Sequence, residues 1–208
     1  MSPLLITLLG VMLVPLFVGT WRTSLVGLSC QGFVLAWIAY RRAPDFGTPS
    51  DWVTFADLVL LRAIAAPLLL ARVLKSQNVP SRNDVIPPNL LSWTIALGMV
   101  LIAFNLAQSL VPEAGDAQTH VAVAATGLLL GFLVLGTQSG HFSQMVGALR
   151  IENAIALFEL GGQRGHALLG VQIGQLAVVA ITIFYFRRSL VALGRAPTAE
   201  GAPAGPTL

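Results

Sequence analysis

Long apolar runs recur along this whole chain, and they constrain its fold more than any other feature. The runs reach or approach the length of about 18 residues that a helix needs to cross a bilayer. They lie at about 3–20, 24–40, 53–74, 89–111, 119–137, 142–161 and 166–186. Charged residues make up only 10% of the chain, whereas soluble domains carry roughly 25%, so little polar surface remains to cover a soluble core. The sequence therefore predicts an all-α polytopic membrane protein with about seven transmembrane helices.

The segments that connect these runs are short, so we expect neither a separate soluble domain nor a nucleotide site. We divide the chain into an N-terminal four-helix membrane region at 1–112 and a C-terminal three-helix unit at 119–188. Residues 189–208 are rich in Ala, Pro and Gly, a composition typical of disorder. We expect this last segment to form a disordered tail.

Basic residues are unevenly shared between the two sides that seven spans would define. One side holds Arg41, Arg42 and Arg164, and the other holds Arg22, Arg72, Lys75, Arg82, Arg187, Arg188 and Arg195. Because cytoplasmic loops carry an excess of Lys and Arg, the N-terminus is predicted outside and the C-terminus in the cytoplasm. The net charge of +3 is scattered over helix ends, which indicates a lipid bilayer and no nucleic acid as the partner.

Metal and cofactor chemistry finds little support in the composition. Cys30 is the single cysteine, so an internal disulfide and a cysteine-based metal cluster are excluded. The three histidines, His120, His141 and His166, lie in separate loops or at ends of runs and lack metal-ligand spacing. We therefore expect no metal, no other cofactor and no catalysis by this chain alone.

Acidic residues in the run at 142–161 give the first functional signal. An ionisable residue at bilayer depth costs at least about 2.5 kcal/mol on insertion scales, so it indicates a functional site by default. Glu152 and Glu159 are seven residues apart, which places them within about 20° of each other on one helix face. His141 extends the same stripe. Buried carboxyl groups can take up and release protons near neutral pH, so the stripe is suited to a proton relay.

Arg62 and Asp57 in the run at 53–74 give a second signal. Arg62 falls near mid-span and keeps its proton, so it can bias a neighbouring carboxylate but cannot relay a proton. Asp57 lies five residues earlier, and an α-helix would point the two side chains about 140° apart. The two are therefore not obvious partners within the helix. Pro67, further along, would free a backbone carbonyl and kink the helix.

Other polar residues are candidates for support of the stripe. Arg150 and Asn153 lie off the Glu152 face and are expected to contact neighbouring helices, and Gln172 and Gln175 in the last run could order water. A structural interpretation stays open at this stage. Glu152 and Arg150 could form a purely structural pair, and Glu159 could simply be solvated.

The segment "TGLLLGFLVLGTQSGHFSQMVGALRIENAIALFELG" (126–161) resembles the first two helices of the K subunit of respiratory complex I. The chain resembles more closely component E of hydrogenase-4 and of related formate hydrogenlyases, which ends in the same three-helix unit. This resemblance covers the runs from 53 to 186 well and the first two runs only by hydropathy. This resemblance implies that Glu152 matches the buried glutamate of the family's proton pathway and Arg62 its membrane lysine. Where family members place another acid in the last helix, this chain has Gly174 in "LGVQIG".

The resemblance implies a membrane-arm subunit of an oxidoreductase complex in the bacterial cytoplasmic (inner) membrane. Such a subunit carries no redox centre and no cofactor. Its partners would be antiporter-like membrane chains, a membrane chain similar to the H subunit of complex I and, through them, a peripheral hydrogenase or dehydrogenase arm. Two alternatives stay open: the small subunit of a multisubunit cation/proton antiporter, which shares the three-helix unit, and a purely structural membrane scaffold.

Overall fold

The computed structural model describes residues 3–17, 20–43, 45–76, 90–112, 115–137, 141–161 and 169–193. Its elements are α1 (Pro3–Phe17), α2 (Trp21–Arg42), α3 (Pro49–Ala56), the π-helix η1 (Asp57–Ala65), α4 (Ala66–Ser76), α5 (Leu90–Leu110), α6 (Asp116–Thr137), α7 (His141–Gly161) and α8 (Leu169–Leu193). Because α3, η1 and α4 are continuous, these described residues form seven helical rods and no strand. The helix α8 extends beyond the expected end at 188, and 194–208 lie outside the described residues.

Helix length and composition agree with membrane insertion. Within the described ranges, four helices are long and apolar enough to cross a bilayer: Trp21–Arg42, Pro49–Arg72, Trp93–Leu110 and Asp116–Thr137. Pro3–Leu13 is a shorter apolar helix. Large apolar side chains such as Phe132, Leu101 and Phe184 stand exposed on the outer faces, as lipid-facing residues do. The all-α polytopic membrane fold predicted from hydropathy is confirmed.

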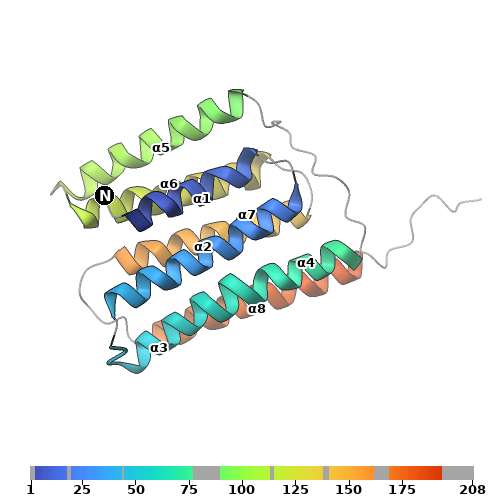
Figure 1. Cartoon of the computed structure of the whole chain (residues 1–208). Helices are drawn as coiled ribbons and strands as arrows, with labels where there is room; N and C mark the ends of the chain where they lie inside the picture. The colour runs from blue at the N-terminus through green and yellow to red at the C-terminus, as the bar shows by residue number, and fades with distance from the viewer. Residues whose placement is uncertain are drawn as a thin grey trace, which may run out of the picture.

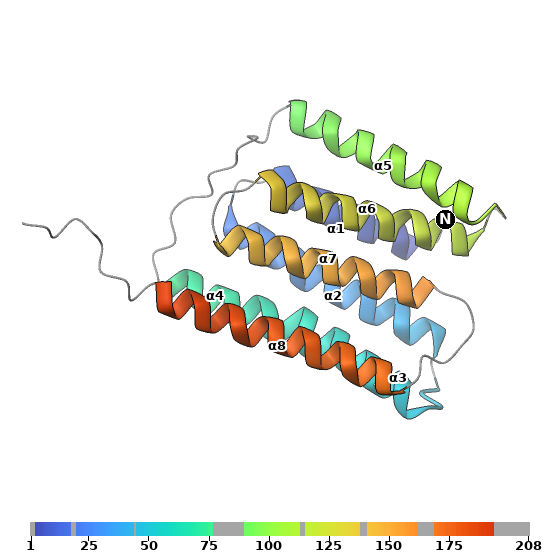
Figure 2. The ribbon, with the colours of Figure 1, turned by 180° about the vertical axis from the view of Figure 1, so that it is seen from behind.

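The rods form two facing rows. One row contains α1, α2 and the α3–η1–α4 rod, and the other contains α6, α7 and α8 (Figures 1 and 2). Across the rows α1 packs on α6, α2 on α7, and α3 and α4 on α8, while α5 packs against α6 at one edge. The helix α2 therefore lies between η1 and α7, where it contacts both.

Two apolar clusters fill the space between the rows. One joins α1, α2, α6 and α7 through residues such as Leu8, Leu35 and Leu157. The other joins α2, α4, α7 and α8 through residues such as Leu28 and Val146. Because α2 and α7 both take part in the two clusters, these two helices form the centre of the fold.

Glycines bring α6 and α7 into close contact. A Cβ atom on Gly131 would lie 2.6 Å from Cγ1 of Ile151, and one on Gly127 would lie 2.9 Å from Cβ of Ala154. Membrane helices gain affinity for each other mainly through such close packing of small residues. Since Ile151 directly precedes Glu152, this contact fixes the position of Glu152 along α6.

We expect Gly131→Val to destabilise the protein. The added side chain would collide with Ile151, and overpacking of this kind costs about 1–3 kcal/mol. Thermal unfolding in mild detergent measures the effect. Gly136→Val is the matched control, because it lies on the same helix and a Cβ there meets nothing within 4 Å. Equal melting temperatures for the two variants would contradict the assignment of a tight α6–α7 contact.

The start of the α3–η1–α4 rod is defined by a local cap. The backbone N–H of Thr48 donates to Oδ2 of Asp51 at 3.0 Å, and Pro49 occupies the first turn. A carboxylate at this position satisfies a free N–H, and Pro fits the first helical turn without losing a hydrogen bond. This cap sets where the rod begins, and so helps to set the depth of η1.

Candidate functional site: a polar cluster between η1, α7 and α8

Asp57 and Arg62 form a buried ion pair, with Nε of Arg62 2.7 Å from Oδ2 of Asp57. The sequence argument, by which these two side chains were not obvious partners within the helix, is wrong. It assumed an α-helix, whereas Asp57–Ala65 is a π-helix, in which hydrogen bonds link residues five apart. Residues at i and i+5 therefore come onto the same face. The N–H of Ala66 accordingly donates to the carbonyl of Leu61.

Pro67 gives a local reason for leaving the α register. Proline has no N–H, and its ring clashes with the carbonyl four residues earlier, which here belongs to Ala63. The π-helix ends two residues before Pro67. The proline was therefore the sequence signal for an irregular helix, although it did not indicate which side chains the irregularity would bring together.

The ion pair is not fully satisfied by its own two members. Arg62 is 7% exposed and Asp57 is 9% exposed. Among the described residues, neither Nη1 of Arg62 nor Oδ1 of Asp57 has a hydrogen-bond partner. Buried charged groups are stable only when they are paired and hydrogen-bonded. These two unsatisfied atoms mean that the ion pair can form further hydrogen bonds, for example with water or with another polar group.

Glu152 on α7 belongs to the same electrostatic cluster. Its carboxylate interacts with the charges of Arg62 and Asp57 and forms a side-chain hydrogen bond with Thr182 of α8. Its Oε2 atom is buried and, within the described part of the chain, has no hydrogen-bond partner. The structure therefore brings together three residues that the sequence singled out on two separate runs.

Glu159 continues this arrangement toward one end of α7. Its Oε1 accepts a hydrogen bond from Nε2 of Gln175 on α8, and its carboxylate also interacts with Arg62 and Asp57. Glu159 itself is exposed. Gln175, singled out as polar support, thus contacts an acid of the stripe directly.

The polar residues of α7 and α8 lie in matching register. Glu159 follows Glu152 by seven residues, and Thr182 follows Gln175 by seven. Since Glu152 meets Thr182 and Glu159 meets Gln175, the helices run antiparallel with two polar stripes facing each other. The step of seven residues corresponds to about 10 Å along a helix. Acids on α7 are therefore matched by neutral hydrogen-bonding groups on α8.

Asn153 and Arg150 turn away from this stripe. Nδ2 of Asn153 donates to Oε1 of Gln31 on α2 at 3.3 Å, a contact between two buried amides. Arg150 is also buried. Sequence reasoning missed Gln31, although a glutamine within an apolar run was a signal for it. It also missed Thr182, for which no signal exists, because threonine is common in membrane helices and can bond to its own backbone.

The side chains of two candidate residues lie outside the part that the structure describes, and Gly174 has free space beside it. The side chains of His141 and Gln172 lie outside the described part, as does the whole of His166. A Cβ atom on Gly174 meets nothing within 4 Å, so a side chain would fit where the resembling family carries an acid. Within the described residues, no group of three or more His, Cys, Asp or Glu side chains could hold a metal ion.

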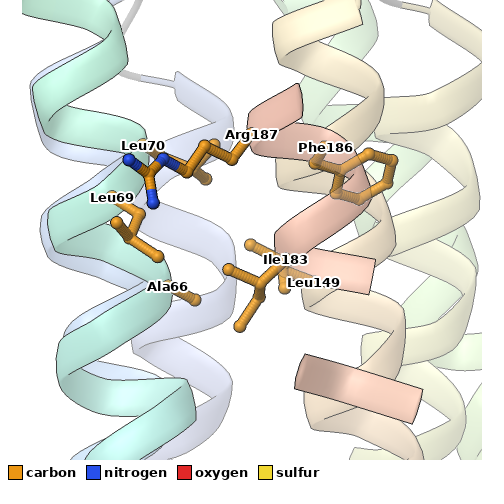
Figure 3. A pocket seen from close by; sticks show the side chains of 7 residues that line it. All are labelled: Ala66, Leu69, Leu70, Leu149, Ile183, Phe186 and Arg187. Carbon is orange, nitrogen blue, oxygen red and sulfur yellow. The ribbon is translucent and has the colours of Figure 1, made fainter. Parts of the chain in front are cut away.

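A small pocket lies apart from the polar cluster. Its lining is apolar apart from Arg187, which is near Leu69 and Leu70 of α4 (Figure 3). The other lining residues are Ala66, Leu149, Ile183 and Phe186. Because this lining contains neither an acid nor a nucleophile, the pocket offers no chemistry. The polar cluster is the better candidate for a functional site.

Comparison with known proteins identifies what the chain resembles. The hydrogenase-4 component E proteins of Escherichia coli K12, Escherichia coli O157:H7 and Shigella flexneri are each 26% identical to it over 178 residues. The match covers 83% of this chain and 82% of each of those proteins. The chain is similar to hydrogenase-4 component E over most of its length. The resemblance to hydrogenase-4 component E inferred from the sequence is thus confirmed.

Other comparisons add no further relative. No family model matches the chain, and no solved structure matches it. The similarity to hydrogenase-4 component E extends over most of both chains. It therefore agrees with one continuous membrane fold.

Proposed function

We propose that this chain is a non-redox membrane subunit of a complex I-related hydrogenase, of the hydrogenase-4 or formate hydrogenlyase type, and that it carries part of a proton pathway. Its similarity to hydrogenase-4 component E supports the class of complex. The proton pathway is supported by the proximity of Arg62, Asp57 and Glu152, which come from two rods. Each of the three side chains has a buried polar atom without a hydrogen-bond partner among the described residues.

Each residue of the cluster has a distinct chemical task in this proposal. Glu152 takes up and releases the proton, because a carboxyl group can exist in both forms. Arg62 stays charged and stabilises the ionised form of Glu152, since opposite charges attract strongly in a medium of low dielectric constant. Asp57 offsets part of the Arg62 charge, which keeps Glu152 from being held permanently ionised.

Glu159 would continue the path toward the end of α7. It stands about 10 Å from Glu152 along the helix, too far for direct transfer, so water must bridge the two. Thr182 and Gln175 supply hydrogen-bonding groups along the facing helix. They can orient such water but do not titrate. His141, at the opposite end of α7, would provide the third titratable group of the stripe.

We also infer how the chain sits in its membrane and its complex. The distribution of basic residues favours the bacterial cytoplasmic membrane with the N-terminus outside and the C-terminus in the cytoplasm. The row of α6, α7 and α8 would be the three-helix unit at 119–188, packed on the membrane region at 1–112. Antiporter-like chains and a chain similar to the H subunit of complex I would be neighbours and would connect it to a peripheral hydrogenase arm.

Co-purification tests the class of complex. The tagged chain, extracted from its native membrane in mild detergent, should bring down hydrogenase subunits together with other membrane chains. An antiporter complex without any redox subunit would overturn the proposal in favour of the antiporter alternative. A Glu152 variant, discussed below, tests the proton pathway separately from the identity of the complex.

A further inference from the structure

Two consecutive residues of α2 touch both sides of the polar cluster. Gln31 binds Asn153, the residue that follows Glu152 on α7, at 3.3 Å. Gly32 lies against Ala63, the residue that follows Arg62 on η1. A single dipeptide of α2 therefore contacts the immediate neighbour of the proposed proton carrier and the immediate neighbour of its fixed positive charge.

The contact at Gly32 permits no side chain. A Cβ atom there would lie 2.6 Å from both the Cα and the N of Ala63. These are backbone atoms, which cannot rotate away as a flexible side chain could. The backbones of α2 and η1 consequently approach each other at this level because residue 32 is glycine. This close approach fixes the depth of Arg62 relative to α2.

The contact at Gln31 is difficult to explain by stability. Gln31 is only 1% exposed, and among the described residues its Nε2 has no hydrogen-bond partner. A buried N–H donor without an acceptor destabilises a protein. A single hydrogen bond between membrane helices contributes only about 0.6 kcal/mol on average, which does not offset that cost. A leucine would fill the same space without the open donor. The amide is better explained by a need to hold Asn153, and so α7, at one depth.

We propose that Gln31 and Gly32 are positioning residues that set the depth of Arg62 relative to Glu152. The inference rests on the proposed function, because it concerns the same acid and the same arginine. A slip of one residue along a helix moves a side chain by about 1.5 Å and turns it by about 100°. Interactions between charges in a low-dielectric interior change steeply with such displacements, so proton transfer depends on this register.

Variants of α2 in the intact complex test the proposal. Gln31→Leu should leave assembly and redox turnover near those of the unmodified complex, whereas Gly32→Ala should lower assembly, because its Cβ must displace the backbone of η1. Protons moved per redox turnover should fall about threefold in Gln31→Leu, the change in the equilibrium between helix registers that one lost membrane hydrogen bond produces. The ratio should fall at least as far in the Gly32→Ala complexes that assemble. Membrane vesicles provide both readouts, namely redox turnover and the quenching of a pH-sensitive dye.

Exchange of the two amides separates positioning from packing. Gln31→Asn combined with Asn153→Gln keeps the combined side-chain length and the hydrogen bond, so the exchange should restore the ratio that either single change lowers. Gly98→Ala and Gly10→Ala are matched controls, because a Cβ at either site meets nothing within 4 Å. They should leave the ratio unchanged.

Each outcome of this test has one meaning. A normal ratio in Gln31→Leu and Gly32→Ala overturns the positioning role, provided that Glu152→Gln loses proton movement in the same assay. A normal ratio in Glu152→Gln means that the proposed function itself has failed. If Gly32→Ala does not assemble, Gln31→Leu and the exchanged pair decide. Failure of these two to assemble would also overturn the proposal, because it would assign the amides a role in folding.

Discussion

The Glu152→Gln variant should assemble normally and should almost stop moving protons. The two side chains have nearly the same shape, so the packing of α7 against α6 is kept. The amide can still accept a hydrogen bond from Thr182, its partner on α8. It cannot take up or release a proton. Because removal of a proton-transferring group commonly lowers a rate by a factor of about 100 or more, we expect at least a tenfold fall in protons moved per redox turnover.

Glu159→Gln is the matched control for this change. It makes the same chemical replacement one heptad away, at an exposed position where Gln175 already supplies a hydrogen bond. Solvent or a nearby group can replace an exposed carboxyl group more easily than the half-buried one of Glu152, so we expect a smaller loss. Dye quenching and redox turnover should be measured on the same vesicles. Unchanged coupling in Glu152→Gln would favour the structural-scaffold alternative.

Removal of Arg62 alone should destabilise the protein severely. The Arg62→Leu variant leaves the carboxylate of Asp57 buried in an apolar interior with no counter-charge. Breaking a buried ion pair in this way costs about 3–5 kcal/mol. Recovery of folded protein from detergent and its melting temperature should both fall. Arg72→Leu is the control on the same rod, because Arg72 is exposed and such a charge contributes less than about 1 kcal/mol.

Removal of both partners should separate stability from function. The Asp57→Leu, Arg62→Leu double variant replaces the buried pair with apolar side chains, which is often neutral or stabilising. We therefore expect it to recover most of the lost stability while protons moved per turnover stay low. Recovery of both properties in the double variant would mean that the pair has a structural role only.

The positions of the helices along the chain could be predicted from hydropathy because a bilayer tolerates few alternatives. A run of apolar residues long enough to span the membrane must satisfy its backbone hydrogen bonds internally, and it does so as a helix. The stripe of Glu152 and Glu159 was predictable for the same reason, since α7 is a regular α-helix and its spacing follows from the helical period. The prediction that these acids point to a functional site remains a prediction.

The partners of these acids could not be predicted, because they depend on contacts between helices. The pairing of Asp57 with Arg62 requires a π-helix, and the 3.6-residue period gave the wrong relative direction. The contact between Glu152 and Thr182 depends on how α8 is registered against α7. Gln31 was visible as a polar residue in an apolar run, but its partner Asn153 lies 122 positions away in the sequence.

The π-helix also has a consequence for how relatives of this chain should be compared. A π turn contains one more residue than an α turn and behaves as an insertion within the helix. A relative that lacks one residue between Arg62 and Pro67 would keep an α-helix there, and an acid and a base five residues apart would then point about 140° away from each other. An alignment gap in this short segment would therefore separate chains that can form the Asp57–Arg62 pair from chains that cannot, even when both residues are present.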